Sequence, residues 1–153
     1  MTNPFDFVSG NVITAAQLNA IGDFESWTPT LTNISIGNGS VTAHYAEVNE
    51  IVYFEIKMTC GSTTSFSGTS MQFTVPVTIG SSLTYNPNGG GWAVPTGGSF
   101  YPIQTVIFAD GRIVPYAFNA SATYATATSI RGTIPETWNS SGTLFMSGTY
   151  RAS

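Results

Sequence analysis

One histidine, one cysteine and eight acidic residues are the side chains in this sequence with the most obvious capacity for chemistry. A zinc site needs several Cys, His or carboxylate ligands gathered in space, whereas His44 and Cys60 are each the only residue of their type. A Ser-His-Asp centre could use only His44, and the Gly-x-Ser-x-Gly turn of α/β-hydrolases is absent. The sequence therefore predicts no metal site, no cofactor and no nucleophilic catalytic centre.

Two carboxylates that converge in space can hydrolyse glycosides, so pairs of acidic residues are candidates for catalysis. Asp23 and Glu25 fall in a linker, Asp110 falls in a turn, and Glu55 is placed to form a cross-strand pair with Lys57 or Arg131. The remaining candidates for such a pair are Glu47, Glu50 and Glu136. We expect a protein that is not an enzyme, with an enzyme acting on cell-wall polysaccharide as the alternative.

Aromatic residues within and beside a glycine-rich stretch are the candidate ligand-binding residues. Residues 80–99 are expected to be the longest irregular segment, and residues 86–101 read NPNGGGWAVPTGGSFY. Aromatic faces beside neutral hydroxyl and amide groups are typical of sugar-binding surfaces. Trp92 could instead plug one end of a barrel or pack on a neighbouring subunit. The candidate ligand-binding residues there are Trp92, Tyr85 and Tyr101, and Trp138 in the separate stretch ETWNSSG is a fourth candidate with the same alternatives.

Charge is scarce in this chain, and that limits its partners. Charged residues make up 8% of the sequence and the net charge is −4, whereas about 25% is usual in globular domains. Four scattered cations cannot form a phosphate-binding stripe, so nucleic acid is not an expected partner. No apolar run is long enough to span a bilayer, and the N-terminus lacks the features of a signal peptide. A surface with few charges favours a subunit packed in an assembly.

The sequence from residue 27 to residue 153 predicts an all-β domain. Residues 51–60 alternate apolar and polar side chains, which predicts a half-buried antiparallel strand with Cys60 on the buried side. His44 is expected on the outward face of the preceding strand. Eight to ten strands with regular turn signals fit an antiparallel sandwich, a jelly roll or a small barrel.

Turn residues predict two hairpins, one tight turn and the position of two strands. Asn38-Gly39 is a strong hairpin signal, Asn49-Glu50 marks a tight turn, and Asp110-Gly111 marks a second hairpin. Pro102 and Pro115 predict that their strands lie at a sheet edge or at a bulge, because proline cannot donate to the ladder.

Residues 1–26 are expected to be an attachment segment that carries one short helix near residues 14–21. Thr14 is a good N-cap, with Gln17 completing a capping box, and Gly22 suits the position after the helix. Such a short helix needs a partner surface to be stable. The predicted attachment and interface residues are apolar or aromatic, namely Phe5, Phe7, Val8, Ile13, Leu18, Ile21 and, from the β domain, Tyr53.

Several short stretches together resemble small virion proteins of tailed bacteriophages. They read FVSGNVITAAQLNAIGDF, SWTPTLT, GNGSVTAHYAEVNEIVYFEI and, at the C-terminus, MSGTYRA. The resemblance covers the first 60 residues well and the last ten loosely. In such minor tail, tail-fibre, head-fibre and decoration proteins, a short N-terminal helix precedes a β-sandwich or barrel that is commonly trimeric.

The resemblance implies a subunit of a virion with no catalytic residues. We expect a tail-associated fibre or adhesion subunit that displays the loops at 61–70 and 80–101 to a glycan of the host surface. The alternative is a capsid decoration or head-fibre protein bound to the shell through its N-terminal segment. Both imply a homo-oligomer, with a trimer favoured, and other virion proteins as partners.

Overall fold

The computed structural model describes residues 10, 12, 14–15, 21–80, 85–120 and 125–153, and this part of the chain is all-β. Within these residues no helix is long and apolar enough to cross a membrane. The strands are β1 (Glu25–Ser26), β2 (Leu31–Thr32), β3 (Ile34–Ser35), β4 (Ser40–Val48), β5 (Ile51–Thr59), β6 (Ser65–Phe66), β7 (Gln72–Thr74), β8 (Tyr85–Val94), β9 (Tyr101–Phe108), β10 (Arg112–Asn119), β11 (Thr126–Ser129) and β12 (Thr143–Arg151).

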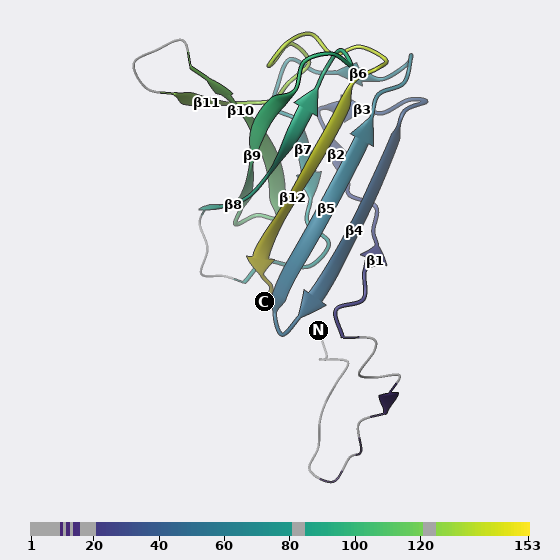
Figure 1. Ribbon diagram of the computed structural model, residues 1–153, viewed down its shortest axis with the longest axis vertical. Helices are drawn as coiled ribbons and strands as arrows, with labels where there is room; N and C mark the ends of the chain where they lie inside the picture. Colours follow the sequence, from purple (N-terminus) through teal and green to yellow (C-terminus); the bar gives the residue numbers. More distant parts are fainter. Residues whose placement is uncertain (1–9, 11, 13, 16–20, 81–84, 121–124) are drawn as a thin grey trace.

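Ten of these strands form one antiparallel sheet, which confirms the predicted fold class. The strand order is β1-β4-β5-β12-β8-β9-β10-β7-β2, with β11 paired to β10, while β3 and β6 form a separate pair. Figure 1 shows the sheet curled into a half-barrel, with β4, β5 and β12 in front and β7 and β2 behind. The C-terminal strand β12 lies between β5 and β8, so it joins the first half of the chain to the second.

The core fills the concave side of the curled sheet because its strands alternate buried and outward-facing residues. The predicted alternation of residues 51–60 is confirmed, and Cys60 is buried as expected. Strand β12 alternates in the same way. The largest buried side chains include Val52, Phe54, Ile56, Met58, Met71, Phe73, Ile107, Ile113, Leu144 and Met146.

Aromatic residues pack the core near the β4–β5 turn. The Trp27 ring lies edge-on to Tyr45 and Phe54, with ring centroids 5.9 and 6.3 Å apart. The Tyr150 hydroxyl donates to the carbonyl of Val77 at 2.8 Å and accepts from the Val77 N–H at 3.0 Å. The two hydrogen bonds of Tyr150 link β12 to the segment after β7, which is distant in the sequence.

The predicted tight turn and one of the two predicted hairpins are confirmed, and the other hairpin is wrong. Asn49 and Glu50 both have positive φ and join β4 to β5, and Asp110-Gly111 joins β9 to β10. A turn does form before Gly39, whose N–H donates to Ile36, but β3 pairs with β6 and not with β4. The Asn38 side chain accepts from the Thr63 N–H at 2.9 Å, which holds this turn against the segment after β5.

The glycine-rich segment was predicted to be irregular, and this prediction is wrong. Residues 85–94 form β8, which pairs with both β12 and β9. A Cβ atom placed on Gly89 or Gly91 would overlap the carbonyl oxygen of Ser147 or Phe145 on β12. The glycines therefore allow a close approach of the β8 and β12 backbones.

The prediction that Pro102 and Pro115 mark a sheet edge or a bulge is also wrong. Strands β9 and β10 both lie inside the sheet, and the register shift between β8 and β9 falls at Asn86–Gly89, away from Pro102. The carbonyl of Pro115 accepts a hydrogen bond from the Ile130 N–H. The nitrogen of Pro115 points to the same side of β10, and on that side the neighbouring strand changes from β7 to β11. Pro102 pairs with Trp92 of β8 but lies beyond the last pair between β9 and β10. Each proline thus occupies a place where a ladder is interrupted or ends.

The N-terminal segment contributes to the sheet before the predicted domain start at residue 27. Glu25 and Ser26 form β1 and pair with Tyr45 and His44 of β4. Gly22 has φ +79°, the left-handed conformation expected for a residue that follows a helix. Most of the helix predicted near residues 14–21 lies outside the described residues, as do Phe5, Phe7, Val8, Ile13 and Leu18.

Candidate functional site: an aromatic row on the convex face

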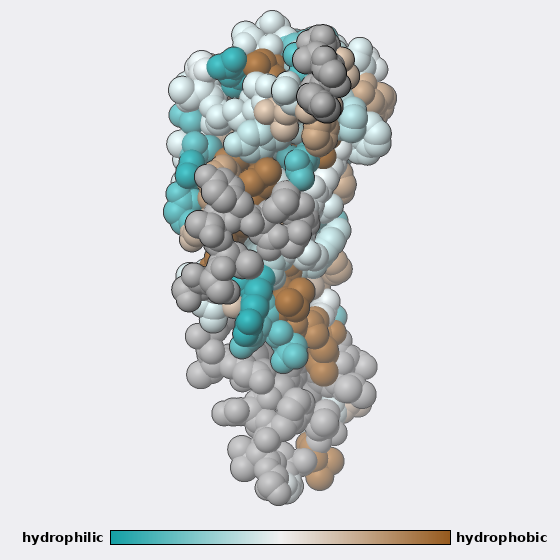
Figure 2. Space-filling view, turned by 90° about the vertical axis from the view of Figure 1, so that its left-hand side faces the viewer, coloured by the Kyte–Doolittle hydropathy of each residue, from teal (hydrophilic) through white to brown (hydrophobic). Residues whose placement is uncertain are grey.

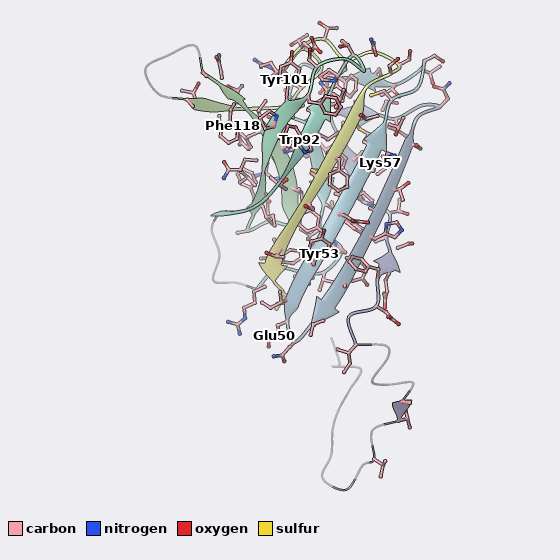
Figure 3. The ribbon with its side chains drawn as sticks, viewed as in Figure 1. Glu50, Tyr53, Lys57, Trp92, Tyr101 and Phe118 are labelled. Carbon is pink, nitrogen blue, oxygen red and sulfur yellow. The ribbon has the colours of Figure 1, made fainter. Side chains whose placement is uncertain are left out.

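Exposed aromatic side chains form a row across the convex face of the sheet. Phe145 of β12 lies directly opposite Trp92 of β8, and Trp92 lies opposite Pro102 of β9. Tyr116 of β10 pairs with Gln104, which faces outward. Phe118 follows Tyr116 by two residues, so it lies on the same outward side of the sheet. We name Phe118, Trp92 and Phe145 the aromatic row, and Figure 3 shows Phe118, Trp92 and Lys57 following one another across the strands.

These aromatic residues keep a large part of their surface in solvent. Phe145, Trp92 and Phe118 are 42%, 49% and 50% exposed. Phe100 is more exposed still, and its ring lies edge-on to Trp92 with centroids 6.3 Å apart. Adjacent strands are about 4.8 Å apart, so Phe145 and Trp92 present neighbouring apolar faces. Contiguous exposed apolar groups of this kind mark binding sites or interfaces.

A polar row runs beside the aromatic row on the same face. It crosses the sheet in register from His44 through Glu55, Ser147 and Gly90 to Gln104. Gly90 carries no side chain, so the surface next to Trp92 is open at that position. The Ser147 hydroxyl and the Gln104 amide thus lie two residues along their strands from Phe145 and Pro102, whereas His44 and Glu55 lie farther along the polar row. Hydroxyl and amide groups beside stacking surfaces suit a ligand with both apolar faces and hydroxyls.

The charges near the row are few. The His44 Nδ1 atom lies 3.4 Å from the Glu55 carboxylate, so the expected pairing of Glu55 with Lys57 or Arg131 is wrong. The physical reason is strand register, because His44 of β4 stands directly opposite Glu55 of β5. Lys57 stands opposite Phe145 and forms no ion pair with any residue in the described part of the chain.

The other predicted ligand-binding residues do not join Trp92. Tyr101 pairs with the buried Ala93, so it faces the core and lies on the opposite side of the sheet from Trp92. Trp138 is a core residue rather than a ligand contact, because it is buried, packs against Phe66 and donates to the Ile134 carbonyl at 3.2 Å. The backbone of Tyr85 begins β8, opposite Phe108.

The position of Trp92 also corrects the alternative in which it plugs a barrel. Trp92 faces outward from a strand inside the sheet. The two interpretations that remain for Trp92 are a ligand contact and a subunit contact. Tyr53, predicted as a subunit contact, does lie on the convex face, but Phe24 of the same chain packs edge-on against its ring at 5.7 Å. Ile21 is exposed.

Sequence reasoning missed Phe145 and Phe118. Phe145 could have been found, because it is the outward position between the buried Leu144 and Met146 in an alternating strand. Phe118 lies near the end of β10, where alternation gives a weaker signal. Elsewhere, a shallow pocket lined by Phe66, Ser67, Gly68, Gly132 and Thr133 contains no titratable side chain.

Two further features bear on chemistry. In the described part of the chain, no group of three or more His, Cys, Asp and Glu side chains could hold a metal ion. Burial raises the pKa of the Cys60 thiol to about 11, so this thiol is protonated at neutral pH.

Comparison of the chain with protein-family models, with curated proteins and with solved structures found no match.

Proposed function

We propose that this protein is a non-enzymatic structural subunit of a tailed-bacteriophage virion, which attaches to a host-surface glycan through the aromatic row. The observation that carries the glycan part is the exposure of Trp92, Phe145 and Phe118 on one face beside a polar row. The C–H faces of sugar rings stack on aromatic rings, while their hydroxyls need donors and acceptors close by.

The virion part of the proposal rests on the resemblance of the first 60 residues to small phage virion proteins. The low content of charged residues supports it, because a subunit held in an assembly needs less charge for solubility than a free monomer. In this proposal the attachment surface is the face of the sheet, whereas the sequence had suggested the loops at 61–70 and 80–101.

Glycan-array binding of the full chain and of Trp92→Ala tests the glycan part. We expect Trp92→Ala to lose binding while its circular dichroism and thermal unfolding stay unchanged, because Trp92 is half exposed and outside the core. Tyr101→Phe is the matched control, since it alters an aromatic residue on the other side of the same sheet. Equal glycan binding by wild type and Trp92→Ala would refute the proposed site.

A capsid decoration or head-fibre protein is the second candidate. It is favoured by exposed apolar side chains where the N-terminal segment meets the sheet, including Phe24 at 59% exposed. In that case residues 1–26 would hold the chain on the shell, and Trp92→Ala would leave particle binding intact.

A further inference from the structure

A lysine stands in line with the aromatic row on the convex face of the sheet (Figure 3). Lys57 of β5 lies directly opposite Phe145 of β12, which in turn lies opposite Trp92 of β8. Residues directly opposite each other on antiparallel strands point to the same face of a sheet, and adjacent strands are about 4.8 Å apart. Lys57 is exposed, so the aromatic surface borders a cation on its β5 side.

Basic residues are scarce in this chain, which makes the position of Lys57 informative. The sequence holds four of them, and Arg112 and Arg151 are held in ion pairs at 2.6 and 2.8 Å. Arg131 belongs to the segment after β11. On the face that Figure 2 presents, hydrophilic residues in teal form separate patches among pale and brown ones. Of the four basic residues, Lys57 is the one that lies beside the aromatic row.

Protection of a sheet edge does not account for Lys57. Lysines on edge strands discourage pairing with other chains, but β5 lies inside the sheet between β4 and β12. A cross-strand ion pair does not account for it either, because the residues opposite Lys57 are Thr42 and Phe145. The ammonium group of Lys57 is therefore available to a ligand that lies on the row.

Negative charge near Lys57 is low. Within the aromatic and polar rows the one carboxylate is that of Glu55, which lies 3.4 Å from the His44 Nδ1 atom. Glu50 and Asp110 lie in turns, about 20 Å or more along β5 and β9 from the row at about 3.3 Å per residue. Exposed charges farther apart than about 8 Å are largely screened at physiological salt. An acidic group on the row would therefore be attracted to Lys57 far more than it is repelled by these turn carboxylates.

We infer that the glycan bound by the aromatic row carries an acidic group, a carboxylate or a phosphate, which Lys57 binds. This inference rests on the proposed function, because the row must first bind a saccharide. Sugar rings would stack on Trp92 and Phe145, and the acidic group would lie one strand farther, against Lys57. The lysine ammonium is a point charge on a flexible stem, so it suits either acid. Because the pair is exposed, it would select between glycans and add little to total affinity.

Matched pairs of glycans test the inference on the full chain. One pair is a glycan that contains a uronic acid and the same glycan with its carboxylate reduced to an alcohol. The other pair is a phosphorylated glycan and its dephosphorylated form. A glycan array identifies the members to use, and titration calorimetry measures each affinity. We expect the acidic member of at least one pair to bind about two- to fivefold more tightly, as an exposed ion pair provides, and the preference to fade as NaCl is raised. The pair that shows the preference identifies the acid.

Four variants localise the preference. Lys57→Gln should lower the affinity for the acidic member to that for the neutral member, whereas Lys57→Arg should retain the preference because it keeps the charge. Arg131→Gln is the matched control, since it removes the same charge from an exposed residue outside the row, and it should also retain the preference. Trp92→Ala should weaken the binding of both members.

Failure of the inference and failure of the proposed function give different results. Equal affinity of wild type for both members of both pairs, or a preference that survives in Lys57→Gln, would overturn the inference and leave the glycan site in place. Loss of the preference in Arg131→Gln would overturn it too, because the cause would then be the overall charge. If wild type binds no glycan, or if Trp92→Ala binds as tightly as wild type, the proposed function fails and the inference fails with it.

Discussion

Single residues of this protein divide into outward-facing ones that carry the proposed function and buried ones that carry stability. Tyr150 belongs to the second group, because its hydroxyl is buried and holds both backbone polar groups of Val77. Burial is the main cause that raises the pKa of the Tyr150 phenol. The Tyr150 hydroxyl therefore stabilises the fold.

Replacing Tyr150 by phenylalanine leaves the N–H and carbonyl of Val77 without their partner. An unsatisfied buried polar group costs about 1–3 kcal/mol, so the free energy of unfolding of Tyr150→Phe should fall by about that much. Chemical denaturation measures it. Tyr53→Phe, whose hydroxyl is on the convex face, is the control and should unfold like wild type.

Cys60 should be inert in the folded protein. Because its pKa is raised to about 11 from an ordinary value of 9.0, the thiol stays protonated at pH 8 and should react with iodoacetamide only after unfolding. The raised pKa also means that its contribution to stability is complete below pH 9 and is lost as the pH rises toward 11.

Cys60→Ala isolates that contribution from those of the other groups in the protein. The free energy of unfolding of this variant should fall less steeply between pH 9 and 11 than that of wild type. A native thiol that reacts rapidly at pH 8, or identical pH profiles for the two proteins, would contradict the burial of Cys60.

At the scale of elements, the sequence was most informative where alternation and turn chemistry agree. Strand β5 and the Asn49-Glu50 turn were predictable because one face is apolar throughout and the turn allows positive φ. Strand β8 was not predictable, because three consecutive glycines are typical of loops and the close backbone approach that they permit is a tertiary property. The aromatic row depends on register between distant strands, so only Trp92 was found.

Glycines 89 to 91 provide a sharp test of this explanation of β8. Gly91→Ala should destabilise the protein by about 1–3 kcal/mol, as overpacking does, because the added Cβ would overlap the Phe145 carbonyl. Gly90→Ala is the matched control. Its Cβ would approach only the Ile103 carbonyl, at 3.4 Å, so its free energy of unfolding should stay within about 0.5 kcal/mol of wild type. Equal effects of the two substitutions would contradict the close approach of β8 and β12.

At the scale of the whole molecule, the convex face of the curled sheet carries the proposed function. The aromatic row lies on this face and has few charges near it. We propose that the row recognises a glycan, so the convex face must stay exposed when the subunit is part of a particle.

The proposal also includes a homotrimer, as the resemblance to phage virion proteins implies. Light scattering coupled to size-exclusion chromatography should give three times the monomer mass. A monomer at micromolar concentration would remove the trimer from the proposal.

Immunogold electron microscopy of purified phage particles, with antibody against residues 27–153, tests the central claim most directly. We predict gold at the tail tip or baseplate, where an adhesion subunit must be placed to meet the host surface. Gold spread over the head would instead support the decoration or head-fibre candidate and reduce the aromatic row to a packing surface. Particles that carry no gold at all would contradict a role in the virion.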